Sequence, residues 1–343
     1  MKSRKKAYAA AGVDVDLGNK VKSGIQKMVQ STHGPEVLGR IGGFGGLFRA
    51  SFKGMKDPIL VSSMDGVGTK LKIAFSMKRY SSVAQDLINH CIDDIAVIGA
   101  KPLFFLDYVA AAKLEPLVFQ QLIAGFSKAC AAGKCALIGG ETAQMPGMYQ
   151  PGEFDLAGCI VGVVDRAKMI DGRKIVRGDV IIGLKSNGLH TNGYSLARKV
   201  LFEKMKLRPS SRLKGLTTTV GEELLKVHKN YQPLLASLAP GVLKGAAHIT
   251  GGGLIDNLPR VLPKNCTARI DASSWKVPAI FQAIETGGKV DPLEMYQVFN
   301  MGIGMALIVS RKDADAVKKK TGGIIIGEVV KGNGLVEIVL KKS

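Results

Sequence analysis

A stretch with phosphate-binding chemistry follows an apolar run near the start of the chain. It reads SSMDGVGTKLKI over residues 62–73 and supplies an acid, glycines, a hydroxyl and an amine. The glycines allow main-chain N–H groups to approach an anion without a Cβ in the way. The pattern matches neither G-x-x-x-x-G-K-[ST] nor G-x-G-x-x-G, so a tight turn capped by an aspartate explains it equally well. The candidate residues are Asp65, Gly66, Gly68, Thr69 and Lys70.

Two further acids occur in similar surroundings. In IGGETAQMPGMY, residues 138–149, Glu141 follows two glycines and precedes Thr142. Asp94 lies at the edge of the apolar stripe of a predicted helix, where an unpaired carboxylate is costly, although a solvated or salt-bridged residue also fits. Together with Asp65 these acids form a hard-oxygen set. Because Mg²⁺ typically binds one or two carboxylates plus phosphates and water, the set predicts a Mg–ATP site.

A glycine-rich segment, GRIGGFGGLFR, precedes the first acid at residues 39–49. It predicts a flap over the nucleotide, with Gly43 and Gly45 approaching the phosphates and Arg40 or Arg49 nearby. A glycine hairpin turn is an equally good interpretation.

The second half contains two loops with a shared layout, SNGLHTNGYSLAR (186–198) and AHITGGGLIDNLPRVLP (247–263). Each has a histidine, then hydroxyl or amide residues and glycines, then a predicted helix, and such helix starts bind phosphate. His190 and His248 are therefore candidates for proton transfer, although a lone loop histidine is more often structural. The candidate substrate-binding residues are Asn192, Thr250, Gly251, Gly252 and Gly253.

Alternating strand and helix patterns must position these residues. Apolar runs predict strands at 58–64, 103–110, 135–140, 157–164, 179–186, 267–271, 303–310 and 334–340. Three- and four-residue spacing predicts helices at 81–98, 114–132 and 194–205. A polar, turn-rich segment at 165–179 separates the halves. We therefore expect an α/β protein with two domains, residues 1–168 and 169–343.

Composition limits the classes of function. The chain has 343 residues, 46% of them hydrophobic and 22% charged, with a net charge of +20. That charge fits nucleic acid or phosphorylated metabolites, but the lysines are scattered and no nucleic-acid motif occurs. No apolar stretch reaches the roughly 18 residues of a membrane span, and the basic start lacks a signal core. Five cysteines without a C-x-x-C pair favour a reducing cytoplasm.

With these motifs in place, the chain resembles the phosphoribosylformylglycinamidine cyclo-ligase (aminoimidazole ribonucleotide synthetase) family almost from end to end. The motifs are YAAAGVDVDLGN, PEVLGRIGGFGG, DGVGTKL, GAKPLFFLDY, GGETAQMPGMY, HTNGYSLAR, HITGGGLIDNLPRVLP and EMYQVFNMGIGM. The glycine-acid loops belong to a wider superfamily, whereas PLFFLDY and EMYQVFNMGIGM are more specific. Gln144 stands where the family usually has glutamate, so a charge-dependent role there is in doubt.

The resemblance implies two α/β domains, with strands of the N-terminal domain forming a barrel across a homodimer. It implies that formylglycinamidine ribonucleotide and ATP give aminoimidazole ribonucleotide, ADP and phosphate. An amide oxygen is a poor leaving group, so ATP would first phosphorylate the formyl oxygen and the amidine nitrogen would then displace phosphate. Asp65, Asp94 and Glu141 would hold Mg²⁺, Lys70 and the loop amides the phosphates, and the TGGG loop the ribose phosphate.

Two other interpretations stay open at this point. Another member of the superfamily, such as a small-molecule kinase or an amidotransferase synthetase subunit, would keep the ATP site and change the acceptor. A basic nucleic-acid or scaffold protein would bind strands with steep salt dependence and would not turn over ATP. The partners we expect are a ribonucleotide substrate and a second copy of the chain, without nucleic acid or membrane.

Overall fold

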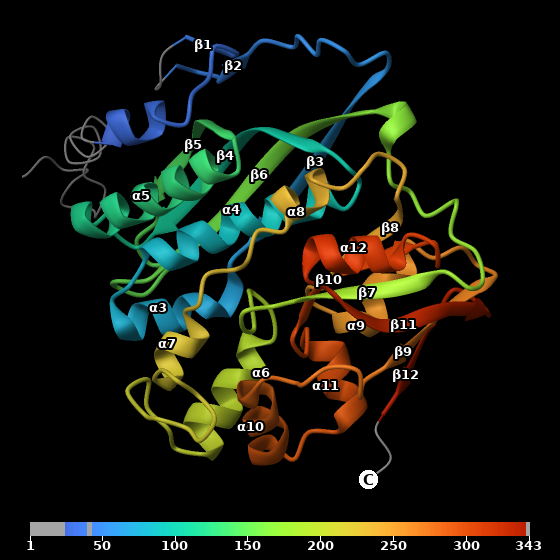
Figure 1. Ribbon diagram of the computed structural model, residues 1–343. Coiled ribbons are helices and arrows are strands. Elements are labelled where there is room, and N and C mark those ends of the chain that lie inside the picture. Colours follow the sequence, from blue (N-terminus) through green and yellow to red (C-terminus); the bar gives the residue numbers. More distant parts are fainter. Residues whose placement is uncertain (1–24, 40–42, 341–343) are drawn as a thin grey trace, which may run out of the picture.

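The computed structural model describes residues 25–39 and 43–340, which form two sheets with helices packed on them (Figure 1). The first sheet has the order β3-β6-β4-β5, and only β4 and β5 run parallel. Its strands are β3 (Pro58–Gly66), β4 (Lys101–Ala111), β5 (Ala136–Gln144) and β6 (Phe154–Asp165). The helices α4 (Ser81–Ala96) and α5 (Pro116–Ala132) pack on each other beside this sheet. These elements confirm the strands and helices expected between residues 58 and 164.

One face of the first sheet is covered by α4, and among the described residues the other face keeps several side chains exposed. Along β3 exposed and partly buried residues alternate, as expected for a strand with two different environments. Met64 is 70% exposed, and its neighbours across the sheet are Cys159 and then Leu106. Leu60 is 62% exposed on the same face. The uncovered face is therefore partly apolar.

The helix α4 is buried on both sides. Its predicted apolar stripe, including Leu87, Ile88 and Ile92, lies in the core. The opposite side carries Asp86 and Asp93, which are also fully buried. The sequence alone gives these acids the polar side of an amphipathic helix, but the second domain packs there.

The second sheet has the order β12-β9-β11-β7-β10-β8 and is antiparallel except for the β12–β9 pair. Its strands are β7 (Val180–Lys185), β8 (Leu243–His248), β9 (Cys266–Asp271), β10 (Ile303–Val309), β11 (Ile324–Lys331) and β12 (Val336–Val339). The sequence predicts four of these and misses β8 and β11. Gly245 and Gly327 interrupt the apolar runs of the two missed strands.

The remaining elements are short. The predicted helix at 194–205 is α6 (Tyr194–Arg198) followed by a π-helical turn, Lys199–Lys204. The other helices are α3 (Leu71–Met77), α7 (Val220–Leu224), α8 (Gln232–Ala236), α9 (Gly253–Asn257), α10 (Ala279–Gly288), α11 (Pro292–Val298) and α12 (Ala314–Thr321). The strands β1 (Val37–Leu38) and β2 (Leu47–Phe48) form a separate hairpin.

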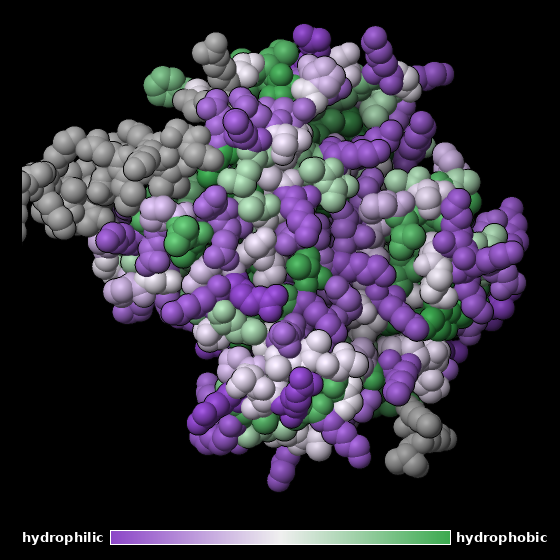
Figure 2. Space-filling view, turned by 60° about the vertical axis from the view of Figure 1, so that its left-hand side comes forward, coloured by the Kyte–Doolittle hydropathy of each residue, from purple (hydrophilic) through white to green (hydrophobic). Residues whose placement is uncertain are grey.

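The two sheets are built from residues on either side of 168, and the boundary predicted there stays a prediction. Among the described residues no helix is long and apolar enough to cross a membrane. On the face presented in Figure 2, hydrophilic side chains predominate and apolar ones form small separate groups. Arg40 of the predicted flap lies outside the described residues.

Candidate active site

Two carboxylates meet a histidine where the domains join. β3 ends at Gly66, so Asp65 lies at the end of a strand as predicted. His90 Nε2 lies 2.6 Å from Asp65 Oδ2 and 3.8 Å from Asp94 Oδ2, since α4 presents His90 and Asp94 four residues apart. The side chains of Asp65 and Asp94 are 37% and 27% exposed. The structure therefore brings these two predicted ligands together with their oxygens accessible.

The charges of this cluster are matched. Burial alone would raise the pKa of Asp65, but the hydrogen bond and positive charge of His90 outweigh it and lower the pKa. The same balance, with His248 as the main partner, lowers the pKa of Asp94. Burial would lower the pKa of His90, but the two carboxylates raise it. Both acids are therefore ionised at neutral pH.

The second domain contributes three more histidines to the same seam. His248, at the end of β8, lies with Nδ1 2.8 Å from Asp94 Oδ1 and Nε2 3.0 Å from Nε2 of His228. His190 stacks on His228 with ring centroids 4.1 Å apart. Thr191 Oγ1 lies 2.6 Å from His90 Nδ1 and 3.4 Å from His228 Nδ1. Four of the five histidines of the chain thus form one buried group.

Lys70 departs from its predicted role. It ends a 3₁₀ turn and is fully buried, with Nζ 2.7 Å from Asp86 Oδ2. The ammonium also donates to the carbonyl oxygens of His190, at 2.9 Å, and Lys226, at 2.7 Å. All three of its protons are used, one within the first domain and two on carbonyls of the second. The expectation that Lys70 lies free beside a phosphate is therefore wrong in this structure, because the turn directs the side chain inward.

The other residues of that glycine turn stay near the surface. Gly68 adopts φ +64, and a Cβ built there would meet nothing within 4 Å. Thr69 Oγ1 lies 3.1 Å from Ser195 Oγ in the second domain and is exposed. The amide of Gly66 donates to Asp65 Oδ1 at 2.6 Å.

The predicted substrate-binding residues also come together. A Cβ built on Gly251 would lie 3.1 Å from Asn192 Oδ1, so the two second-domain loops touch. Asn257 donates to the carbonyl oxygens of Gly251 and Gly253, while Thr250 Oγ1 donates to Asn257 Oδ1 at 3.2 Å. Gly252 adopts φ +96, which favours glycine. The helix that follows, α9, has only five residues. An anion bound at this loop would therefore rely on the amides of the loop and not on the helix.

Glu141 lies in a different place from the two aspartates. It lines a cavity of about 660 Å³ that is also bounded by Thr142, Gly43 and Gly45. β6 and β4 separate β5 from β3, so Glu141 and Asp65 are three strand spacings apart, roughly 14 Å. Within one chain the predicted set of three acids therefore does not converge on one ion.

The same cavity contains an acid that sequence patterns do not single out. Asp107 lies on β4 between Gly140 and Gly158 of the neighbouring strands. Burial, with a smaller contribution from Glu141, raises the pKa of Asp107 to about 7.

At the end of the same strand as Glu141, Gln144 Oε1 accepts a hydrogen bond from the amide of Leu114 at 3.3 Å. The side-chain oxygen of Gln144 therefore contacts the loop that leads into α5.

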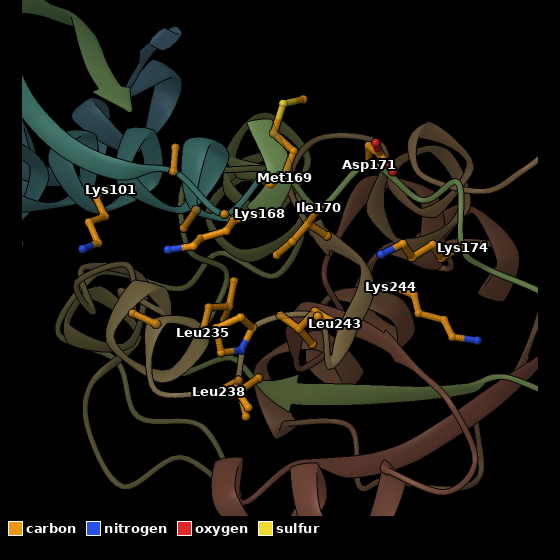
Figure 3. A pocket seen from close by; sticks show the side chains of 18 of the residues that line it. Lys101, Lys168, Met169, Ile170, Asp171, Lys174, Leu235, Leu238, Leu243 and Lys244 are labelled. Carbon is orange, nitrogen blue, oxygen red and sulfur yellow. The ribbon is translucent and has the colours of Figure 1, made fainter. Parts of the chain in front are cut away.

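A larger cavity, of about 820 Å³, lies elsewhere along the seam between the domains (Figure 3). Lys101, Lys168 and Lys174 line it above apolar side chains such as Leu235 and Leu238. None of the catalytic or binding residues predicted from sequence lines this cavity. The volume of a cavity is therefore a poor guide to the chemistry of this molecule.

Sequence reasoning missed His228 and gave His90 no role. Neither histidine lies beside a glycine-acid loop. The two rings come together only because the second domain packs against α4. The one available signal was the polar side of α4, where Asp86, His90 and Asp93 recur at helical spacing.

Comparison with known families classifies this arrangement. Residues 50–164 match the family described as AIR synthase related protein, N-terminal domain. Residues 176–339 match its C-terminal domain. The chain is thus an AIR synthase related protein with both the N-terminal and the C-terminal domain of that class.

Its relatives narrow the class to one family. The chain is 50% identical over 334 residues to a phosphoribosylformylglycinamidine cyclo-ligase from Syntrophotalea carbinolica, covering 96% of this chain and 95% of that protein. It is 49% identical over 337 residues to one from Citrifermentans bemidjiense, covering 96% and 97%. The chain belongs to the phosphoribosylformylglycinamidine cyclo-ligase family. This confirms the family predicted from the sequence.

Solved structures share the fold at low identity. Hydrogenase maturation protein HypE in complex with ATP aligns with TM-score 0.65 and 14% identity, covering 94% of this chain and 91% of that one. Thiamine-monophosphate kinase from Stenotrophomonas maltophilia aligns with TM-score 0.63 and 16% identity, covering 95% and 96%. They support the predicted two-domain α/β fold.

Proposed function

We propose that ring closure takes place at the seam between the domains, with the nucleotide entering from the cavity at Glu141. The chain is an ATP-dependent carbon–nitrogen ligase of purine biosynthesis. It converts formylglycinamidine ribonucleotide to aminoimidazole ribonucleotide and releases ADP and phosphate. The paired carboxylates Asp65 and Asp94, with His248 of the second domain 2.8 Å from Asp94 Oδ1, are the observation that carries the proposed location.

The reaction needs charge stabilisation and positioning. The γ-phosphoryl group is transferred to the formyl oxygen, the amidine nitrogen attacks the same carbon, and the C–O bond breaks as phosphate leaves. Negative charge accumulates on the transferring phosphoryl oxygens. The amide of Gly68 and the hydroxyl of Thr69, both on exposed residues of the turn that follows Asp65, are suited to hold those oxygens.

We assign Mg²⁺ to Asp65 and Asp94. Both are ionised, partly exposed oxygen donors, which is what Mg²⁺ prefers, and His90 and His248 fix their orientation from behind. A bound Mg²⁺ would neutralise phosphate charge. Two carboxylates leave positions for phosphate oxygens and water, so the donor set fits the ion without Glu141.

Glu141 acts, in this proposal, on a nucleotide shared with a second copy of the chain. The uncovered face of the first sheet, with Leu60, Met64 and Leu106, supports a homodimer in which the β3 edge of one chain meets the β5 edge of its partner. Glu141, Thr142, Gly43 and Gly45 would then bind ATP whose phosphates reach the partner's Asp65 and Asp94.

We propose that the ribose phosphate binds to the loop Thr250–Gly253 and to Asn192. Gly251 has no side chain to block an anion at the main chain, and the side chain of Asn192 lies beside it. Because α9 has only five residues, individual N–H groups and not a helix dipole would bind the phosphate.

The attacking nitrogen must lose a proton, and His190 or His248 remains the proposed acceptor. Burial lowers the pKa of both imidazoles, so each is neutral at pH 7. Neither ring nitrogen of His190 has a hydrogen-bond partner, whereas Asp94 and His228 occupy both nitrogens of His248. His190→Ala and His248→Ala should each lower kcat. Full turnover in both variants at saturating substrate would exclude the proposal.

Five free cysteines and a sequence without a nucleic-acid motif fit a small-molecule enzyme of the cytoplasm. We propose no nucleic-acid or membrane partner.

The metal assignment is tested with Asp65→Asn and Asp94→Asn. Removing a charged oxygen donor should raise the KM for Mg–ATP more than the KM for the ribonucleotide, by about tenfold or more. Asp57→Asn, at the exposed start of the same region, is the matched control and should change neither. Equal loss of affinity for both substrates would contradict a metal role.

A further inference from the structure

Three histidines of the second domain bring ring nitrogens to one point. They are His190 in the loop after β7, His228 between α7 and α8, and His248 at the end of β8. One nitrogen of each lies within 4.8 Å of the others. None of the three side chains is more than 6% exposed. Because one domain supplies all three, the group does not depend on domain closure for its geometry.

The environment of these nitrogens suits a metal ion. A neutral imidazole is the commonest protein ligand of transition metals, and three imidazoles are a known zinc donor set. Both ring nitrogens of buried His190 lack a hydrogen-bond partner, which is costly unless something else binds them. Asp94 Oδ1 lies 2.8 Å from Nδ1 of His248. The other ring nitrogen of His248, Nε2, is therefore directed at His228. A carboxylate behind a histidine in this way orients metal ligands.

We propose that His190, His228 and His248 form a binding site for a borderline divalent transition metal such as Zn²⁺, and that occupancy stops ring closure. The inhibition rests on the proposed function, because an imidazole bound to metal cannot take the proton of the amidine. The binding does not rest on it.

The site differs in chemistry from the proposed magnesium site beside it. Asp65 and Asp94 offer accessible oxygens, which Mg²⁺ prefers, while the three imidazoles offer nitrogen, which Zn²⁺ and Co²⁺ prefer. Millimolar Mg²⁺ should therefore not displace a transition metal from the histidines. His248 borders both sites, since Asp94 is its neighbour.

The helix α4 closes the histidine site from the first domain. Asp86 accepts from the amide of His228 at 2.6 Å, and Asn89 donates to the carbonyl of the same residue at 2.7 Å. Asp93 Oδ2 lies 3.7 Å from His228 Nε2 and has no hydrogen-bond partner, so this carboxyl group also closes the site from α4. Entry of an ion requires these contacts to break. Binding should therefore be slow and inhibition time-dependent.

The binding test uses purified full-length protein stripped of metal with a chelator. Co²⁺ is added as a spectroscopic probe, and bound Zn²⁺ is measured separately by equilibrium dialysis. We expect about one ion per chain and the visible absorption of Co²⁺ with nitrogen ligands. His228→Asn should weaken Zn²⁺ binding by about 100-fold or more. The control His33→Asn removes the one histidine outside the group and should bind as the unchanged chain does.

His190→Asn is the second binding variant, because its ring has no hydrogen bond to lose. Its folding and that of His228→Asn are checked by thermal unfolding. If either folded variant binds Zn²⁺ as tightly as the unchanged chain, or if the unchanged chain binds none, the site does not exist.

The inhibition test measures ring closure with excess Mg–ATP after increasing times with Zn²⁺. Activity should fall slowly and return with a chelator. Binding without loss of activity would overturn the inhibitory role while leaving the site. Failure of the metal-free protein to form aminoimidazole ribonucleotide would instead overturn the proposed function, and the binding results would still decide the metal site.

Discussion

Lys70 offers the sharpest contrast between a phosphate ligand and a structural ion pair. Its ammonium lies 2.7 Å from Asp86 of the same domain, both side chains are 0% exposed, and the ammonium also binds two carbonyls of the second domain. Removing the cation in Lys70→Met leaves an uncompensated buried carboxylate. Breaking a buried pair in this way costs about 3–5 kcal/mol, whereas replacing both partners by apolar residues is often nearly neutral. The double variant Lys70→Met/Asp86→Leu should therefore recover most of the lost stability.

The assay is urea unfolding followed by the fluorescence of Trp275, the single tryptophan, which is buried in the second domain. Lys70→Met should shift the midpoint strongly even though residue 70 belongs to the first domain. A loss below about 1 kcal/mol, together with a raised KM for ATP, would refute the structural assignment and restore the phosphate role.

Three further outcomes are expected. Met64→Lys should dissociate the proposed dimer in sedimentation velocity, whereas Leu117→Lys, on an exposed part of α5, should not; a dimeric Met64 variant would exclude that face. Gly140→Ala should cost about 1–3 kcal/mol in urea unfolding, because the new Cβ would overlap Asp107, and unchanged stability would contradict this packing. Burial holds the pKa of His228 well below its usual value. Below pH 6.5 this histidine is therefore protonated in the unfolded chain but stays neutral in the folded chain. Stability is thus lost as the pH falls, by about 1.4 kcal/mol at pH 5.5 for this group, and His228→Asn should remove that part; an identical pH dependence in the variant would argue against a neutral histidine.

Much of the first domain was predictable because its signals are local. The apolar spacing of α4 and the strand that ends at Asp65 follow from side-chain periodicity and turn residues alone. The TGGG loop and Asn192 lie side by side in the structure, and their role in substrate binding stays a prediction.

The parts that sequence reasoning missed depend on packing between distant segments. Lys70 belongs to the same turn as Asp65, yet only the second domain supplies the carbonyls that draw it inward. Glu141 is separated from Asp65 because β6 inserts between β3 and β4. Local sequence patterns do not determine the order of strands in a sheet. His228 lies in a segment with no periodicity, so its place among the histidines required the domain interface.

The central claim is that Asp65 of one subunit and Glu141 of another act on the same nucleotide. The direct test mixes inactive Asp65→Asn chains with inactive Glu141→Gln chains, dissociates them and lets them reassociate. Half of the dimers would be hybrids with one intact site, so ring closure should return to roughly one quarter of the unchanged activity. Hybrids that form but stay inactive would place both acids on a nucleotide held within one chain and contradict the account.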